Sequence, residues 1–258
     1  MKLNSTKQKE LFLKDGYFVC ENIFDISFVQ KILEDIDKAK NTVKYFDNKD
    51  NLRRIEKLFN KGEFLKDLNN KILSVLKEIF DEDFIIFKDK FNAKPPGGEG
   101  FFAHFDGVFN FIDENNKKKN GWYEYGDFFI NVLIALDECN EQNGTIELSN
   151  IHNNNFQELL SKTKNDGTPA LNKQTEDMIL FYPINLKVGD VVIFSNRCPH
   201  RSRANNTNQN RRVLYYTYTR FVNGSKYNQY FIDKEKSKNP SKALVEKKNK
   251  PRPFTKFQ

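Results

Sequence analysis

Two histidine-containing stretches constrain the fold more than any other feature of this sequence. The first is His104-Phe105-Asp106, and the second begins at Pro199-His200. Residues i and i+2 of an extended strand point to the same face, so the side chains of His104 and Asp106 can bind one ion together. With His200 they complete two imidazoles and one carboxylate, a set that covers one face of an iron(II) ion and leaves its other positions open. A fold that uses this set must bring the two stretches together.

The order of apolar and polar residues predicts helices first and mainly strands afterwards. Apolar residues recur at helical spacing in the first third of the chain, and short strands separated by Gly, Asn and Pro turns follow. The nearly unbroken apolar run Phe128–Leu136 is typical of a buried central strand. We therefore expect a mainly β protein with flanking helices, in which the N-terminal helices pack outside a two-sheet barrel or jelly roll.

Periodicity and turn residues also locate the individual elements. Helices are expected at 5–14, 25–40 and 64–80. Strands are expected at 17–23, 84–91, 128–136, 145–148, 188–194 and 212–221. Polar loops are expected at 41–54, 109–121 and 150–175, the last with one helical turn near 157–160.

The positive charge of the chain is concentrated at its C-terminal end. The net charge is +7, and residues 233–258 hold nine Lys/Arg against three Asp/Glu, so +6 of the total lies in this segment. We expect a single domain over residues 1–232 and a basic C-terminal tail over 233–258. Such a tail is usually a solvated extension, and attraction to nucleic acid is the alternative. The chain shows no zinc-finger, RNP or P-loop pattern that would favour the alternative.

Three further absences bear on the compartment. No apolar run approaches membrane-spanning length, and the first residues lack the apolar core of a signal peptide. The three cysteines are odd in number and show no CxxC spacing, which suits a reducing compartment. A cytoplasmic protein without a membrane partner is expected.

The strand predicted at 84–91 carries a polar row on one face. Lys88, Lys90 and Asn92 share this face, whereas the opposite face carries two phenylalanines. One interpretation is a solvated edge, and the other is a polar row that lines the mouth of a barrel. The residues alone favour the solvated edge for Lys88 and leave Lys90 and Asn92 open.

Motifs spread over most of the chain support the same fold. They include Leu13–Val19, Lys94-Pro-Pro-Gly-Gly98, Val188–Phe194, Pro199–Thr207 and Arg211–Tyr218. Together these motifs resemble those of the phytanoyl-CoA dioxygenase-like family of iron(II)/2-oxoglutarate oxygenases. The resemblance implies a double-stranded β-helix core of the jelly-roll or cupin-like type. It also implies Fe(II), 2-oxoglutarate as cosubstrate, and O2.

The same resemblance implies roles for particular residues. It makes His104, Asp106 and His200 the iron ligands and the catalytic centre. The family places an arginine that binds 2-oxoglutarate eleven residues after the second histidine, which is Arg211 here. Arg212 points to the opposite face of the same strand, so only one of the two can enter the barrel.

Other candidates rest on position alone. Lys90, Asn92 and Asn131 are candidates for contact with 2-oxoglutarate, because they lie on strands expected to line the barrel. The candidates for substrate contact are Trp122, Arg201 and Arg203. His152 departs from the family pattern around it and is expected to be a loop residue.

The resulting hypothesis is a dioxygenase that hydroxylates a small, anionic organic substrate and releases succinate and CO2. One alternative is a non-catalytic jelly roll that binds metal and acts as a sensor or binding module. Another is a nucleic-acid-associated protein that uses the basic tail. The sequence defines neither the substrate nor the oligomeric state.

Overall fold

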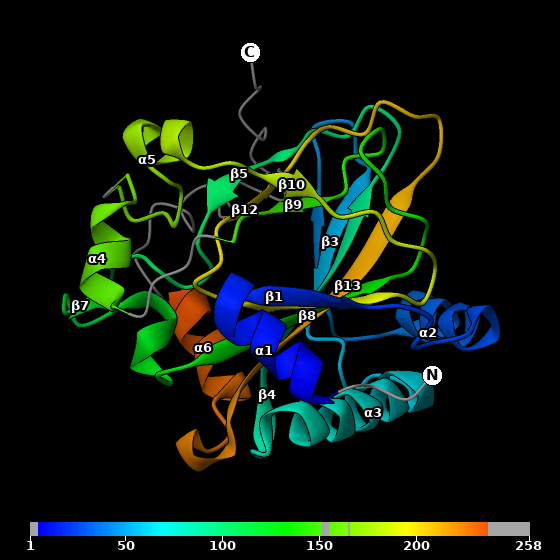
Figure 1. Cartoon of the computed structure of the whole chain (residues 1–258), viewed down its shortest axis with the longest axis horizontal. Helices are drawn as coiled ribbons and strands as arrows, with labels where there is room; N and C mark the ends of the chain where they lie inside the picture. The colour runs from blue at the N-terminus through cyan, green and yellow to red at the C-terminus, as the bar shows by residue number, and fades with distance from the viewer. Residues whose placement is uncertain (1–4, 151–154, 165, 237–258) are drawn as a thin grey trace.

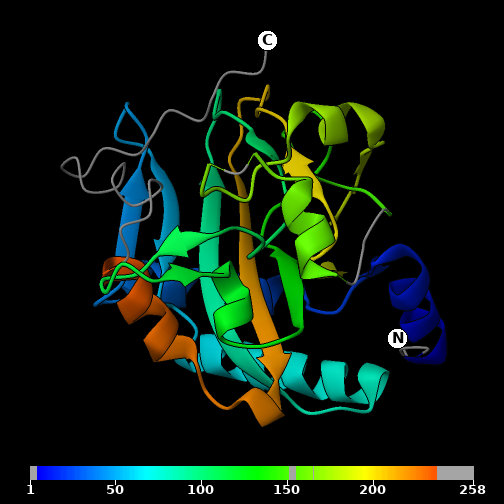
Figure 2. The same ribbon diagram turned by 90° about the vertical axis from the view of Figure 1, so that its left-hand side faces the viewer.

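Two antiparallel sheets form the centre of the computed structural model, which describes residues 5–150, 155–164 and 166–236 (Figures 1 and 2). The larger, seven-stranded sheet has the order β1-β11-β8-β13-β4-β3-β2, and the smaller, four-stranded sheet has the order β10-β9-β12-β5. The strands of the larger sheet are β1 (Tyr17–Cys20), β2 (Val43–Phe46), β3 (Leu52–Glu56), β4 (Phe84–Lys94), β8 (Phe129–Ala135), β11 (Val191–Ser195) and β13 (Arg211–Arg220). Those of the smaller sheet are β5 (Phe101–His104), β9 (Ile146–Leu148), β10 (Tyr182–Pro183) and β12 (His200–Ser202). The predicted mainly β fold with flanking helices is confirmed.

The three N-terminal helices cover the outer side of the larger sheet. The described helices are α1 (Ser5–Asp15), α2 (Ile26–Lys38), α3 (Glu63–Phe80), α4 (Phe156–Ser161), α5 (Lys173–Met178) and α6 (Tyr227–Lys236). Figure 1 shows α3 at the lower end of the larger sheet, and α4 and α5 beside the smaller sheet at the upper left. The buried residues of α3 recur every three or four positions, as expected of an amphipathic helix, at Leu65, Leu68, Ile72, Leu76 and Ile79.

The first turns of α2 and α3 are stabilised by carboxylates. Asp25 caps α2, since its Oδ1 accepts a hydrogen bond of 2.8 Å from the backbone nitrogen of Phe28. Asp35 of α2 accepts hydrogen bonds of 2.8 Å and 3.1 Å from the backbone nitrogens of Phe64 and Leu65 in α3. These N–H groups have no partner within their own helix, so the two carboxylates satisfy them and fix α3 against α2.

Strand β13 separates the outer core from the space between the sheets. Tyr216 and Tyr218 pack into the hydrophobic cluster beneath the helices, whereas Val213 and Tyr215 pack into the cluster between the two sheets. This alternation follows from the two-residue period of a strand. Arg211 therefore lies on the same face of β13 as Val213 and Tyr215, the face toward the space between the sheets. Residues of β4 and β8 that lie opposite these three residues share this inward face.

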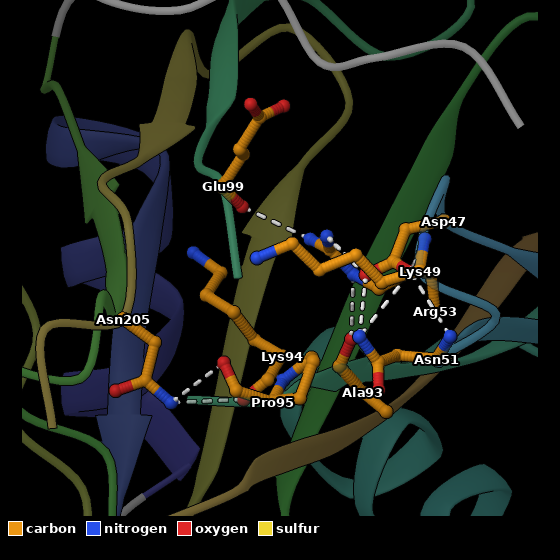
Figure 3. Close-up of polar contacts among 9 residues, drawn as sticks. All are labelled: Asp47, Lys49, Asn51, Arg53, Ala93, Lys94, Pro95, Glu99 and Asn205. Atoms are coloured by element: carbon orange, nitrogen blue, oxygen red, sulfur yellow. Dashed lines mark hydrogen bonds and ion pairs between the residues drawn. The ribbon is translucent and has the colours of Figure 1, made fainter. Parts of the chain in front are cut away.

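Three predicted loops contain regular structure. Residues 41–54 hold β2 and most of β3, residues 109–121 hold the hairpin of β6 (Phe111–Ile112) and β7 (Lys118–Lys119), and residues 150–175 hold α4 and the start of α5. The prediction of loop at 41–54 is wrong because charged side chains on these strands have partners within the fold. Arg53, for example, donates hydrogen bonds to the backbone oxygens of Ala93 and Glu99 (Figure 3).

The expected boundary between domain and tail, at residues 232 and 233, falls inside α6. Asp233 accepts a 2.8 Å hydrogen bond from the hydroxyl of Tyr125, and Lys234 donates to both carboxylate oxygens of the buried Glu56. These bonds join the C-terminal helix to the barrel. The rest of the expected tail, 237–258, and His152 lie outside the described residues. Within the described ranges, no helix is both long enough and apolar enough to cross a membrane.

The packing of α3 can be tested by the substitution Leu68→Ala. Leu68 is fully buried, so we expect the free energy of unfolding to fall by about 2–5 kcal/mol. Lys66→Ala, at an exposed position of the same helix, is the matched control and should change it by less than about 0.5 kcal/mol. Equilibrium unfolding in urea measures both values. Equal stabilities for the two variants would contradict the packing described.

Candidate metal centre

The antiparallel pairing of β5 with β12 brings the two histidine stretches together. His200 lies directly opposite His104 in the register, and their ring centroids are 4.1 Å apart. Asp106 follows β5 by two residues and is held by Asn196, whose backbone oxygen and side-chain nitrogen bond the backbone nitrogen and oxygen of Asp106, each at 3.0 Å. These two bonds hold the backbone of Asp106 in place beside the two histidines.

The three side chains predicted as ligands converge on one point. One donor atom from each of His104, Asp106 and His200 lies within 4.8 Å of the others, and all three residues are buried. Nε2 of His104 lies 3.8 Å from Oδ1 of Asp106, and Nε2 of His200 lies 3.5 Å from Oδ2. This arrangement is able to hold one metal ion on one face, as the sequence predicted.

Hydrogen bonds set which nitrogen of each ring is free. Nδ1 of His104 bonds the backbone oxygen of Phe102 at 2.9 Å, and Nδ1 of His200 bonds that of Cys198 at 3.0 Å. A carbonyl only accepts, so the proton is on Nδ1 and the lone pair of each Nε2 faces Asp106. Burial lowers the pKa of both histidines, which favours the neutral form that metal ions require.

Two polar residues of the larger sheet orient the carboxylate of Asp106. Nδ2 of Asn131 donates a 2.9 Å hydrogen bond to Oδ2 of Asp106, and Oγ1 of Thr217 donates a 2.8 Å bond to Oδ1 of Asn131. Burial opposes ionisation of Asp106, but the nearby positive charges of Lys90 and Lys88 hold its pKa below the usual range. The amide of Asn131, expected to contact 2-oxoglutarate, is directed at the carboxylate instead.

Basic side chains line the inward face of β4 and β13. The register places Lys94 opposite Arg211, Lys90 opposite Tyr215, and Lys88 opposite Thr217. The solvated-edge interpretation of Lys88 is wrong, because β4 lies between β13 and β3 and Lys88 is only 7% exposed. Burial lowers the pKa of Lys90 to about 7 against the opposing effect of Asp106.

Arg211 and Arg212 point to opposite faces, as predicted. Arg211 is 4% exposed and donates a 2.9 Å hydrogen bond to the backbone oxygen of Gly144, but its Nε is buried without a partner. Arg212 instead makes two hydrogen bonds of 2.8 Å to the carboxylate of Asp137. Oδ1 of Asn92, on the inward face of β4, is also buried without a partner. A buried polar atom without a partner is costly, so both atoms are suited to a polar ligand.

Lys94 is a residue of this region that the sequence analysis did not single out. Its Nζ lies 2.9 Å from the backbone oxygen of Gly144 and 2.9 Å from Oγ of Ser202, and it also donates to the backbone oxygen of Arg203. Burial and the charges of Arg211 and Arg53 lower its pKa to about 5. Figure 3 shows Lys94 next to Ala93, whose backbone oxygen accepts a hydrogen bond from Arg53. Lys94 lies on the same face of β4 as Lys88, Lys90 and Asn92, because alternate residues of a strand share a face. This spacing is the sequence signal that predicts an inward side chain for Lys94.

The residues expected to contact substrate have different surroundings. Nε of Arg201 and Nε of Arg203 lie 2.7 Å and 2.6 Å from the two carboxylate oxygens of Glu147, so both guanidinium groups are paired. Arg201 also follows His200 directly on β12 and therefore has the opposite parity. Trp122 packs in the outer core, and one of its rings lies 4.9 Å beneath Nζ of Lys88.

Gly107 allows Trp122 to lie next to the ligand loop. Its φ is +76°, a left-handed conformation that favours glycine, and a Cβ atom there would lie 2.5 Å from the indole of Trp122. The backbone nitrogen of Trp122 also bonds the backbone oxygen of Gly107 at 3.1 Å. Sequence reasoning missed this pairing, although Gly107 directly follows Asp106.

The fold and the three donor residues define a double-stranded β-helix protein with two histidines and one aspartate at its candidate metal centre. The profile of the phytanoyl-CoA dioxygenase (PhyH) family matches residues 12–213. The chain therefore belongs to this family, and the resemblance inferred from its motifs is confirmed.

Two curated relatives act on phosphonates, to judge by their names. The chain is 29% identical over 179 residues to the 2-aminoethylphosphonate dioxygenase of an uncultured bacterium, a match that covers 69% of this chain and 62% of the relative. It is also 29% identical over 168 residues to the methylphosphonate hydroxylase of Gimesia maris, covering 65% and 57% of the two chains. The chain thus spans less than two thirds of either relative.

Solved structures support the fold. EctD from S. alaskensis, solved with 2-oxoglutarate and 5-hydroxyectoine, superposes with a TM-score of 0.64 at 17% sequence identity. The superposition covers 86% of this chain and 80% of EctD. At this identity the likeness establishes the shared architecture, in agreement with the two-sheet barrel described above.

The orienting role of Asn131 can be tested by Asn131→Ala. We expect the affinity for Fe(II) to fall roughly 10- to 100-fold, because Asp106 loses the hydrogen bond that directs its carboxylate. Anaerobic calorimetric titration measures the affinity. Asp106→Ala should abolish binding, whereas Asp137→Ala, which removes an acid paired with Arg212 outside the barrel, should leave it unchanged. Wild-type affinity in a folded Asn131→Ala protein would refute the role.

Proposed function

We propose that this protein is an iron(II)/2-oxoglutarate-dependent dioxygenase that hydroxylates a small anionic substrate with release of succinate and CO2. The observation that carries the proposal is that the three metal donors and Arg211, with its unpaired Nε, lie in the same barrel. Membership of the PhyH family and the names of the curated relatives support the same reaction class.

The donor set fits iron(II). Two neutral imidazoles and one carboxylate form the facial arrangement used by non-haem iron oxygenases, and no thiolate lies among the donors. Bound iron would supply the activation of O2 coupled to oxidation of 2-oxoglutarate. His104, Asp106 and His200 would hold the ion, and Asn131 keeps the carboxylate of Asp106 in place.

The unpaired Nε–H donor of Arg211 fits 2-oxoglutarate, whose carboxylate and keto oxygens accept hydrogen bonds. Nε of Arg211 would donate to the distal carboxylate, because a guanidinium stays charged and binds carboxylates with directed hydrogen bonds. Asn92 and Lys90 lie on the same inward face between Arg211 and the metal ligands, and we propose that they contact the cosubstrate along its length. The apolar residues between the sheets, such as Val213 and Phe194, exclude water from this site.

The basic interior favours an anionic substrate over a neutral one. The phosphonates named in the relatives are small anions, which agrees with the buried lysines of β4. We also propose a cytoplasmic location, which is supported by the three buried cysteine thiols, all of them unpaired. The sensor and nucleic-acid alternatives gain no support from the described residues.

Turnover of 2-oxoglutarate tests the proposed function directly. Protein supplied with Fe(II), O2 and 2-oxoglutarate should release succinate, and 2-aminoethylphosphonate or methylphosphonate should increase the rate. His104→Ala should release none, since a ligand is missing. Succinate is quantified by chromatography, with protein lacking iron as the blank. Succinate release that does not depend on iron, or none at all, would overturn the proposal.

The assignment of Arg211 is tested by Arg211→Gln. Loss of a charge-assisted hydrogen bond costs about 1.5–3 kcal/mol, so the KM for 2-oxoglutarate should rise roughly 10- to 100-fold. Arg212→Gln is the matched control, because the adjacent arginine pairs with Asp137 on the other face and should leave this KM unchanged. A rise in KM for Arg212→Gln but not for Arg211→Gln would reverse the assignment.

A further inference from the structure

Lys88 is a buried ammonium without a hydrogen-bond acceptor. An ammonium has three N–H donors, yet within the described part of the chain Lys88 makes no hydrogen bond and no salt bridge. Its Nζ lies 4.9 Å from a ring of Trp122 and 5.4 Å from that of Tyr230. The rings attract the cation but do not replace an oxygen acceptor, so Lys88 remains able to bind an anion.

Glu56, the acid with the largest electrostatic effect on Lys88, does not fill this role. Glu56 attracts Lys88 through space, but its two oxygens are bonded by Lys234, at 2.8 Å and 2.6 Å, and by the hydroxyl of Tyr45 at 3.0 Å. Arg54 lies 3.7 Å from the same carboxylate. Glu56 is therefore surrounded by basic groups, and the cluster that contains Lys88 keeps a surplus of positive charge.

The strand register places Lys88 beside the metal centre and away from Arg211. Lys88 lies opposite Thr217, which lies opposite Asn131, and Asn131 holds Asp106. Lys90 and then Asn92 follow on the same face toward the pair formed by Lys94 and Arg211. A cosubstrate that extends from the metal to Arg211 passes Lys90 and Asn92, and it leaves Lys88 for a different ligand.

The walls around Lys88 restrict the size of that ligand. Tyr230 belongs to α6, which Lys234 and Asp233 fasten to the barrel, and Trp122 is fixed by its close approach to Gly107. Both aromatic residues are buried and also pack on Phe87. Two rings held in place therefore border the ammonium, and a ligand that reaches it must have a compact head group.

We propose that Lys88 binds the phosphorus oxyanion of the substrate, a small phosphonate or a closely related compound, next to the metal. The inference rests on the proposed function and adds to it the residue that recognises the substrate. An ammonium is a common partner of phosphate-type groups, and here it is already desolvated, so the charge-assisted hydrogen bonds are strong. Lys90, two residues further along β4, contacts 2-oxoglutarate instead.

Anaerobic calorimetry of the Fe(II) protein separates the two lysines. The wild type is titrated first with 2-oxoglutarate and then with methylphosphonate. Lys88→Met should weaken methylphosphonate binding at least tenfold and change the affinity for 2-oxoglutarate less than twofold. Lys90→Met should weaken 2-oxoglutarate binding instead. Lys77→Met, at an exposed lysine of α3, is the matched control and should bind both as the wild type does.

A charge-retaining variant and a neutral ligand keep the test decisive if Lys88→Met folds poorly. Lys88→Arg should restore binding of methylphosphonate to within about tenfold of the wild type, and the neutral dimethyl ester of methylphosphonate should not bind the wild type. The inference is overturned if Lys88→Met binds methylphosphonate as tightly as the wild type does, or if it loses affinity equally for methylphosphonate and 2-oxoglutarate. It is also overturned if the wild type binds the ester tightly, or if it binds 2-oxoglutarate but no methylphosphonate. A wild type that does not bind 2-oxoglutarate with iron overturns the proposed function itself.

Discussion

The site depends on holding one buried carboxylate in a fixed direction. Asp106 lies on a loop, not a strand, and its position comes from Asn196 at the backbone and Asn131 at the side chain. These contacts direct the carboxylate toward the two imidazoles. The position of the imidazoles has a different origin, the pairing of β5 with β12. The metal centre is therefore assembled from both sheets, and a shift of either sheet would separate its donors.

Much of the candidate site follows from sequence because its signals are local. The opposite parity of Arg211 and Arg212 reflects the two-residue period of strands, and the two histidine stretches are recognisable as short motifs. Asp106 differs from the expectation of one continuous strand, because β5 ends at His104 and Asp106 reaches the site from the following loop. Helices α1, α2 and α3 are predictable because burial of one helix face leaves a periodic pattern of apolar residues. Strand β8 is predictable because burial of both its faces leaves an unbroken apolar run.

The remaining features depend on partners that are distant in sequence. The charge of Arg53 favours a loop at β3 in the sequence, because its carbonyl partners near β4 are distant in the chain. The charge of Lys88 likewise favours a solvated edge, because the sequence does not show that β3 pairs with β4 and covers this edge. Arg201 and Arg203 looked available for substrate, but Glu147 on a neighbouring strand pairs with both. In each case a charged side chain was judged by its own polarity, whereas its environment is set by tertiary contacts.

Helix α6 begins after the segment that the family profile matches, yet it packs against the strands of the barrel. Tyr227 bonds the buried Asp89, Lys234 bonds Glu56, and Tyr230 covers Lys88. A protein truncated between β13 and α6 would keep all the metal donors and Arg211, but it would uncover Lys88 and Glu56. Relatives that differ in the sequence of this helix would then be expected to differ in what they accept, even where their metal-binding strands are identical.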